Sequence, residues 1–428
     1  MQSVQQLQQL QFPKELRRLC QLRQPRQYLI LNNRFLPGNW VENVIGRSNG
    51  RRAVTHVSDL VRNPEELRGI VCAVLASAAG IKARPPFFRV FVDSAQRFDL
   101  ADSLFGTEPG LFQDPQRRLP SVLGSDRFCL TLNGLTAWNE EFHRLMQAEI
   151  VSPLVSTDGI LPTAFDFYTF MSTSGFTPFG IHDDRGDALL FHLGPGAKDV
   201  WLWSRARYLA LVGGGWASFD FERMCASGRH IRLEPGDALF IPAGEFHLLR
   251  SADFNMFLGV IIGRQTCASR IKEAVDLFAE LHGDERLRGA LEPASEAGLG
   301  IRRYAAMQEL VLASNGYVSQ PPHMMDDRQC SPREDLFALS CHSVGCKRLA
   351  DAEVLFSRGR VFKTSPNRAI ESVVELVNAG APFDFDRAGR CAEGAMPLDQ
   401  LEAMLRFLVR SRGIAVVPAS AAPSNARP

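Results

Sequence analysis

The chain has 428 residues, of which 45% are hydrophobic and 22% charged, a composition typical of a soluble globular protein whose length predicts two or three domains. Its 48 basic and 47 acidic residues give a formal net charge of +1, which offers no electrostatic reason to expect a nucleic acid or an anionic membrane as partner. The nine cysteines form no CxxC pair and no apolar run approaches the ~18 residues that cross a bilayer, so we expect a cytoplasmic protein without a disulfide framework.

The first segment, residues 1–87, is predicted to be mostly helical. It opens with a polar, glutamine-rich stretch that lacks the apolar core of a signal peptide, and Asn63-Pro64 then starts a helix that stops at Gly80. From residue 88 to residue 264 the pattern changes to short β-rich runs such as "FDFYTFMSTSG" and "DALFIPAG". Because no helices alternate with these strands, they predict an all-β barrel or sandwich.

Helical periodicity returns in residues 265–328, where two stretches each carry one apolar face. From its position we expect this segment to serve in dimerisation. Residues 329–418 follow with a strand pattern, a helix starting at Ser365-Pro366, another starting at Pro397 and a closing "IAVV" strand, which is the outline of a winged helix. The low-complexity tail, residues 419–428, is predicted to be disordered.

One histidine and three aspartates are crowded at the head of a predicted strand in "FGIHDDRGDALLFHLGPGAKDVWLW", residues 179–203. Adjacent carboxylates are costly to bury without a positive partner, which a metal ion would supply. Residues i and i+2 of a strand point to one face, so His182 and Asp184 can bind the same ion while Asp183 points away. His247, in "LEPGDALFIPAGEFHLLRS", follows a tight turn and would complete the two-histidine, one-carboxylate set that suits iron(II).

This order of motifs, HxD followed by PGD, an apolar strand and P-x-G-x-x-H, resembles the JmjC-type cupins, which are iron(II)- and 2-oxoglutarate-dependent oxygenases. Within them the FG-x-H-x-D-x-x-D pattern is most similar to the ribosomal-oxygenase-like branch, and the resemblance extends from about residue 88 to residue 418. It implies a mixed α+β chain with a double-stranded β-helix (cupin, or jelly-roll) core, a helical dimerisation segment and a C-terminal winged-helix domain. It also implies that His182, Asp184 and His247 are the catalytic iron ligands, with 2-oxoglutarate and O₂ as cosubstrates.

The resemblance further assigns the cosubstrate pocket and the reaction. Lys198 falls where the family places the basic residue that pairs with the distal carboxylate of 2-oxoglutarate, and Tyr168 or Thr169 could add a hydroxyl to the same carboxylate. The implied reaction hydroxylates a C–H bond of a polypeptide or peptide-derived substrate while 2-oxoglutarate is decarboxylated to succinate. A ribosomal protein and a peptide natural product both stay open as the substrate. A homodimer is expected, and neither a membrane nor a nucleic acid is.

Several residues near these motifs have more than one interpretation. Asp187 either orients a metal ligand or simply caps or forms a salt bridge. His192 stands where the family often has Gln, and its alternation with apolar residues favours a barrel histidine over a metal ligand. A cysteine- and histidine-containing stretch lacks the repeated spacing of a zinc site, so we do not predict one there; it contains Cys330, Cys341, His342 and Cys346.

Two other classes of function stay open from the sequence. A cupin that has lost catalysis could act with the winged helix as a scaffold or regulatory protein, in which case iron binding would be weak and Lys198 dispensable. Alternatively, a metal-dependent cupin could work without 2-oxoglutarate. Lys198 is the residue that separates both alternatives from the oxygenase.

Overall fold

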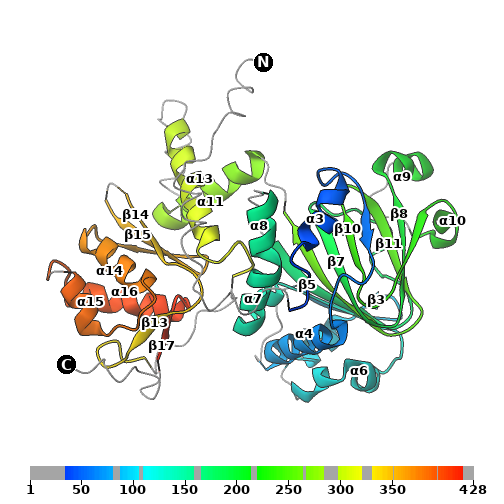
Figure 1. Cartoon of the computed structure of the whole chain (residues 1–428), viewed down its shortest axis with the longest axis horizontal. Coiled ribbons are helices and arrows are strands. Elements are labelled where there is room, and N and C mark those ends of the chain that lie inside the picture. The colour runs from blue at the N-terminus through cyan, green and yellow to red at the C-terminus, as the bar shows by residue number, and fades with distance from the viewer. Residues whose placement is uncertain are drawn as a thin grey trace.

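The computed structural model describes residues 34–80, 87–105, 109–158, 165–213, 219–263, 267–283, 297–320, 330–349, 351–392 and 394–417. The glutamine-rich start and the tail at 419–428 lie outside these ranges. The chain has a mixed α+β fold in which a strand-rich part and a C-terminal part lie side by side (Figure 1). No helix among the described residues is long and apolar enough to cross a bilayer.

The strand-rich part contains two antiparallel sheets. The larger has the order β1-β10-β7-β12-β5-β4-β2-β3 and the smaller the order β6-β11-β8-β9. The larger sheet comprises β1 (Thr55–Val57), β10 (Ala238–Ile241), β7 (Asp187–Pro195), β12 (Asn255–Ile262), β5 (Phe165–Ser172), β4 (Phe128–Asn133), β2 (Phe88–Val92) and β3 (Ala95–Gln96). The smaller comprises β6 (Gly175–Phe176), β11 (Phe246–Ser251), β8 (Lys198–Trp203) and β9 (Arg229–Leu233).

Alternate residues of the two sheets meet in one apolar interior, called here the barrel interior. Its members come from both sheets because successive side chains of a strand point to opposite faces. They include Phe170, Leu190 and Phe257 of the larger sheet and Val200, Leu202 and Leu249 of the smaller. The expectation of an all-β barrel or sandwich is therefore confirmed for these strands, and the cupin subtype stays the implication of the resemblance.

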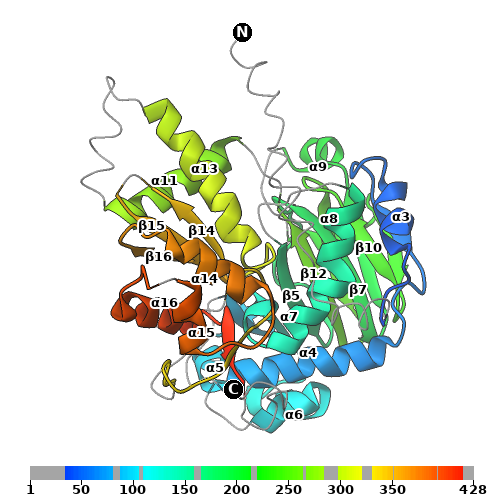
Figure 2. The ribbon, with the colours of Figure 1, turned by 60° about the vertical axis from the view of Figure 1, so that its left-hand side comes forward.

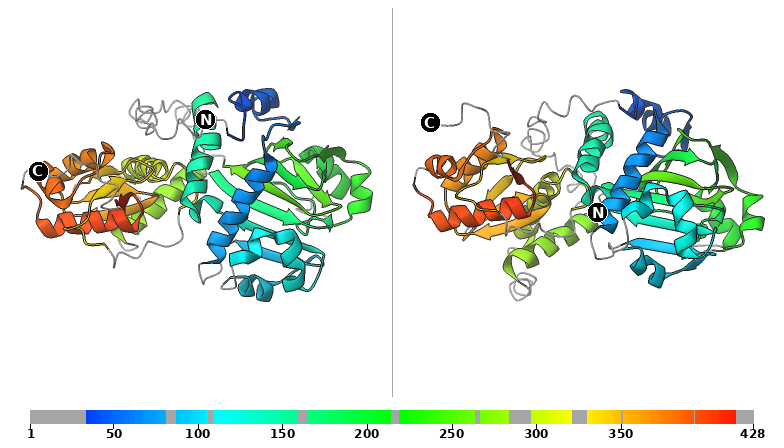
Figure 3. Two further views of the ribbon diagram at one scale, coloured as in Figure 1. Left: turned by 60° about the horizontal axis from the view of Figure 1, so that its bottom comes forward. Right: turned by 90° about the horizontal axis from the view of Figure 1, so that it is seen from below.

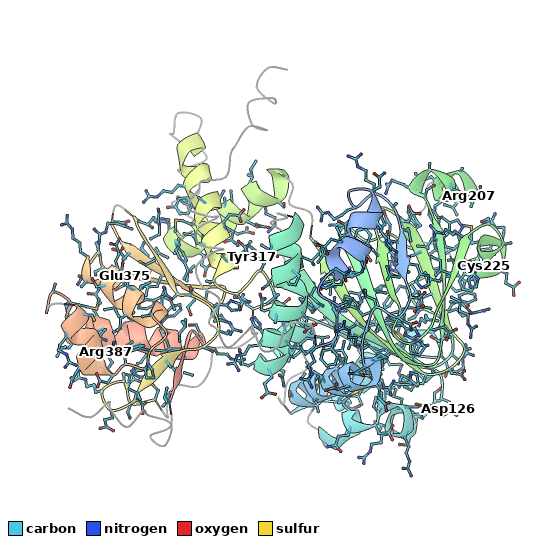
Figure 4. The ribbon with its side chains drawn as sticks, in the orientation of Figure 1. Asp126, Arg207, Cys225, Tyr317, Glu375 and Arg387 are labelled. Atoms are coloured by element: carbon cyan, nitrogen blue, oxygen red, sulfur yellow. The ribbon has the colours of Figure 1, made fainter. Side chains whose placement is uncertain are left out.

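Helices cover the outer faces of both sheets. The outer face of the larger sheet packs against α3 (Trp40–Val44), α4 (Pro64–Ala79), α7 (Glu140–Met146) and α8 (Ser152–Asp158), which Figure 2 shows in front of the strands. Strand β7 is therefore buried on both faces, by these helices on one side and by the barrel interior on the other, which explains why it is an almost continuous apolar run rather than an alternating one. The smaller sheet is covered by α9 (Arg205–Val212) and α10 (Phe221–Cys225), where Figure 4 labels Arg207 and Cys225 at the end of the molecule away from the C-terminal part.

Short elements complete the strand-rich part. They are α5 (Phe98–Ser103), α6 (Pro115–Leu123), the 3₁₀ turns Gly46–Ser48, Pro109–Gln113 and Leu135–Ala137, and a π-helical turn at Gln147–Val151. β1 lies before residue 88 yet pairs with β10, so the larger sheet begins earlier in the chain than the sequence pattern suggested. The predicted domain boundaries at residues 87, 264 and 328 stay predictions.

The C-terminal part begins with two helices, α11 (Cys267–His282) and α13 (Ala297–Ala313), which pack against each other and against β15. Its sheets comprise β13 (Phe337–Leu339) with β17 (Ile414–Val416), and β14 (Gly345–Arg348) with β15 (Glu353–Ser357) and β16 (Arg360–Thr364). Its other helices are α14 (Ala369–Asn378), α15 (Phe385–Cys391) and α16 (Leu398–Arg410). Figure 3 shows this part at the opposite end of the molecule from the barrel strands.

The helix expected to start at Ser365-Pro366 begins at Ala369 instead. Arg368 is its N-cap residue, and the Oδ1 of the preceding Asn367 accepts a hydrogen bond of 3.0 Å from the Ala369 N–H. The second expected helix starts at Leu398 directly after Pro397, as predicted. The winged-helix assignment and the dimerisation role of α11 and α13 stay predictions.

Candidate metal centre

The two histidines of the predicted iron site face each other across an antiparallel bridge. The His247 N–H donates to the His182 carbonyl at 2.8 Å, and the His182 N–H donates back to the His247 carbonyl at 3.3 Å. Side chains opposite one another in such a pair project to the same face. The two imidazole rings consequently lie with their centroids 4.5 Å apart.

Asp184 completes the cluster from the same loop as His182. Its Oδ2 lies 3.8 Å from the His247 Nε2, and one ligand atom from each of the three residues lies within 4.8 Å of the other two. The expected i, i+2 relation therefore brings His182 and Asp184 together. The segment is an isolated bridge rather than a full strand, since β7 begins only at Asp187.

Gly186 allows this loop to approach the larger sheet. A Cβ at this position would stand 2.7 Å from the Ile261 Cγ2 and 2.8 Å from the Ile262 carbonyl oxygen, well inside van der Waals contact. Only glycine therefore fits between β12 and the loop that carries His182 and Asp184, and the loop is held against a strand.

Both imidazoles are held in the tautomer that a metal requires. The Nδ1 of His182 lies 3.1 Å from the Gly180 carbonyl and that of His247 lies 3.3 Å from the Glu245 carbonyl. Because a carbonyl only accepts, each Nδ1 carries a hydrogen, which leaves Nε2 as the nitrogen that could bind a metal. Burial, together with the neighbouring His182, lowers the pKa of His247 to about 4, so that ring is neutral at physiological pH.

The other two aspartates of the motif bind arginines rather than joining the cluster. Asp183 pairs with Arg205 at 3.0 Å. The fully buried Asp187 accepts from the Ala243 N–H at 2.9 Å, and its other oxygen lies 3.2 Å from an Arg51 nitrogen. Ala243 belongs to the turn that leads into His247, so Asp187 is a positioning residue for that ligand.

Removing the Asp187 carboxylate should therefore affect both stability and metal affinity. We expect Asp187→Ala to lower the free energy of unfolding by about 2–4 kcal/mol, because the Arg51 guanidinium and the Ala243 N–H lose a buried partner. Iron affinity should fall about tenfold through the displaced turn. Urea denaturation and iron titration measure the two effects. Asp183→Ala is the matched control, since its arginine partner is exposed and both values should stay near wild type.

Lys198 lies inside the barrel, with none of its side chain exposed. Its ammonium donates to the Ser251 Oγ at 2.6 Å, the Ser172 Oγ at 2.8 Å and the Asn255 Oδ1 at 3.2 Å. All three acceptors are neutral, and within the described parts of the chain no ion pair involves this lysine. Burial accordingly lowers the pKa of Lys198 to about 7. A bound carboxylate would offset the free-energy cost of burying the charged ammonium.

Aromatic rings surround the same ammonium. Its nitrogen lies 4.7 Å from the ring centre of Phe170 and 5.8 Å from that of Phe257. His192 stacks on Phe257 with ring centres 4.6 Å apart, so the structure places this histidine beside the lysine rather than in the metal cluster. A pocket lined in part by Phe91, Arg127, Cys129 and Ser172 adjoins one of the lysine's partners.

The two predicted hydroxyl donors point to opposite faces of β5. Tyr168 shares a face with Phe170 and Ser172 and packs on the barrel interior, and burial, followed by the nearby Asp184 and Asp166 charges, raises its pKa well above the usual value. Thr169 lies on the other face, where its hydroxyl donates to the Phe257 carbonyl at 2.9 Å. The structure thus brings Tyr168 toward the site and does not bring Thr169 there.

The three side-chain oxygens that accept hydrogen bonds from Lys198 were not predicted from the sequence. Ser172, Ser251 and Asn255 end or begin strands and carry no motif of their own. Register reveals them, because Ser251 pairs with Lys198 on β8, and Asn255 pairs with Ser172 on β5. Arg51, the partner of Asp187, was missed as well, because it also carries no motif of its own.

Solved structures similar to the chain include those of YcfD, a ribosomal oxygenase from Escherichia coli. Its complex with cobalt and succinic acid is 16% identical to the chain, and the match covers 89% of this chain and 98% of that one with a TM-score of 0.46. Its complex with cobalt and 2-oxoglutarate is 14% identical, with the same coverages and a TM-score of 0.42.

A smaller likeness is to a cupin superfamily protein from Desulfitobacterium hafniense. It is 16% identical over 24% of this chain and 72% of that one, with a TM-score of 0.17. No protein-family model matches the chain, and no curated protein matches it.

Proposed function

We propose that the chain is an iron(II)- and 2-oxoglutarate-dependent oxygenase that hydroxylates a C–H bond of a polypeptide or peptide-derived substrate. The observation that carries the proposal is the joint placement of two features on β11. His247 is the second residue of this strand and has the other two candidate metal ligands beside it, and Ser251 ends the strand in contact with the buried ammonium of Lys198.

The spacing of these features suits a short dicarboxylate. His247 and Ser251 are four residues apart, which is about 13 Å along a strand and leaves them on the same face. Part of this length is taken by the side chains of His247 and Lys198. The remainder suits a molecule that chelates a metal at one end and presents a carboxylate to an ammonium at the other.

The donor set fits iron(II). Two neutral imidazoles and one carboxylate leave the remaining coordination positions open, which is the arrangement of non-haem iron oxygenases. Bound iron, with 2-oxoglutarate and O₂, supplies the oxidising power that turns a C–H bond into an alcohol while the keto acid becomes succinate and CO₂.

The chain's own residues contribute position and environment. His182, Asp184 and His247 would hold the ion, and the carbonyls of Gly180 and Glu245 keep the two Nε2 atoms available to it. Lys198 would fix the distal carboxylate. Apolar side chains of the barrel interior, among them Leu190 and Leu249, exclude water from the space between.

The first test is uncoupled turnover. Protein purified without oxygen and then supplied with iron(II), 2-oxoglutarate and O₂ should form succinate slowly in the absence of substrate. If the protein bound iron but neither bound 2-oxoglutarate nor converted it to succinate, it would instead be a metal-dependent cupin of another kind. Absence of both iron and keto-acid binding would indicate a scaffold protein and contradict the proposal.

The substrate and assembly follow from the resemblance alone. We propose a polypeptide side chain as the site of hydroxylation, with a ribosomal protein and a peptide natural product as the two candidates. We also propose a homodimer formed through α11 and α13. Mass spectrometry of ribosomal proteins and peptides after incubation with the enzyme, looking for a gain of one oxygen atom, would separate the two substrate classes.

A further inference from the structure

A second group of side chains that could hold a metal ion lies at the junction of the two parts of the molecule. His143 comes from α7, which packs on the larger sheet, whereas Cys341 and His342 follow β13 in the C-terminal part. Figure 4 labels Tyr317 at this junction, between the helices that cover the barrel and the C-terminal strands. The iron site on β11 does not include any of these residues.

The three side chains converge closely. One ligand atom from each, the two imidazole nitrogens and the Cys341 sulfur, lies within 4.8 Å of the other two. The Nε2 atoms of His143 and His342 are 2.6 Å apart. His143 and Cys341 are almost fully buried, and His342 is half-buried. Burial lowers the pKa of both histidines, so the rings are neutral and can donate lone pairs.

Two surrounding contacts hold the cluster in place. The Arg358 guanidinium donates to the Cys341 sulfur at 2.6 Å and to Glu140 Oε2 at 2.9 Å. Gly316, with a φ of 61°, lies so close that a Cβ there would stand 2.6 Å from the His342 Cε1. The imidazole of His342 is therefore confined to its position beside α7.

We propose that His143, Cys341 and His342 bind a divalent zinc-class ion that ties the C-terminal part to α7. Two neutral imidazoles and one thiolate are ligands that zinc prefers, and solvent that reaches the half-buried His342 would take the fourth position. The sequence offered no repeated spacing here because the histidine that completes the set stands 199 positions from His342.

Binding changes both the charge of the cluster and the spacing of its nitrogens. The ion displaces the Cys341 proton to solvent, so the cluster gains one net positive charge, and the thiolate keeps its hydrogen bond from Arg358. The two imidazole nitrogens must separate from 2.6 Å to roughly 3.3 Å, the spacing of two nitrogens on a tetrahedral zinc. Without an ion, one N–H···N hydrogen bond joins the same rings.

Cobalt(II) tests the proposal in a way that the iron site cannot imitate. Cobalt bound by a thiolate gives a near-ultraviolet charge-transfer band, and the iron site contains no cysteine. We expect this band when cobalt is added to the reduced full chain, its retention in the paired variant His182→Ala/His247→Ala, and its loss in Cys341→Ser. Cys346→Ser is the matched control, because this half-buried thiol lies on β14 outside the cluster, and it should keep the band.

Metal counting and thermal unfolding provide independent readouts. The iron-site variant His182→Ala/His247→Ala should retain one zinc per chain after dialysis, and zinc should raise its unfolding temperature. In Cys341→Ser the zinc affinity of this cluster should fall by at least about 100-fold, while slow succinate formation at the iron site is unchanged. A cobalt complex without the charge-transfer band, or a paired histidine variant that retains no zinc, would overturn the proposal whether or not the chain is an oxygenase.

Discussion

Replacing His182 with alanine is expected to abolish 2-oxoglutarate turnover. The residue supplies one of only two imidazoles in the cluster, and its backbone bridge to His247 means that no neighbouring side chain can take its position. We expect succinate formation to fall by at least about 1000-fold and iron affinity by more than about 100-fold. Succinate analysis and anaerobic iron titration measure the two quantities.

His230→Ala is the control for this experiment. His230 lies on β9 of the smaller sheet, separated from β11 by β8, where it pairs with Asp199 at 2.9 Å and stacks on Trp201 outside the barrel interior. Its loss should leave iron binding intact. If His182→Ala bound iron as tightly as wild type, the three-residue cluster would not be the metal centre.

Replacing Lys198 with methionine should have two opposite effects. Affinity for 2-oxoglutarate should fall about 100-fold or more, because the distal carboxylate would be buried without a cation. The metal-free and ligand-free protein should become more stable, by about 1–4 kcal/mol at pH 7, because a buried ammonium with only neutral acceptors is replaced by an apolar chain of similar length. Calorimetric titration and urea denaturation report the two changes.

The stability change should depend on pH in a defined window. Burial lowers the pKa of Lys198 to about 7 in the folded chain, whereas an unfolded lysine titrates near 10.5. Between these values the unfolded chain binds more protons, so the stability of wild type should rise as the pH increases from 7 toward 10. The stability of the methionine variant should not show this rise with pH. A variant less stable than wild type across this range, with unchanged 2-oxoglutarate affinity, would contradict the assigned role.

The two motifs that carry the candidate site stand out in the sequence because each depends largely on local geometry. The i, i+2 relation of His182 and Asp184 needs only an extended backbone, and the PGD turn is fixed locally by the hydrogen bond that the Asp237 carboxylate accepts from the Glu234 N–H. The same carboxylate also accepts from the Asp59 N–H, which is a contact between distant segments. What the sequence did not reveal depends on contacts between distant segments. Arg51 reaches Asp187 only because the chain before residue 88 adds β1 to the larger sheet.

The second metal cluster illustrates the same limit. The sequence places two further cysteines, Cys330 and Cys346, near Cys341 and His342 as candidate ligands. Cys330 packs instead in the apolar core of the C-terminal part, and Cys346 lies on β14. The actual partner is a histidine on a helix of the barrel side, a juxtaposition that follows from how the two parts meet and that no local spacing encodes.

The pairing of β11 with β8 has a consequence for the choice of cosubstrate. His247 is opposite Leu202 and Ser251 is opposite Lys198, so the hydrogen-bonded ladder sets the separation between the backbone positions that carry His247 and Lys198. A ladder changes length only in whole residues, and a slip of one residue would turn Ser251 out of the barrel. Keto acids one carbon longer or shorter than 2-oxoglutarate should therefore be poor substitutes, and selectivity for chain length should survive most changes to the side chains that line the pocket.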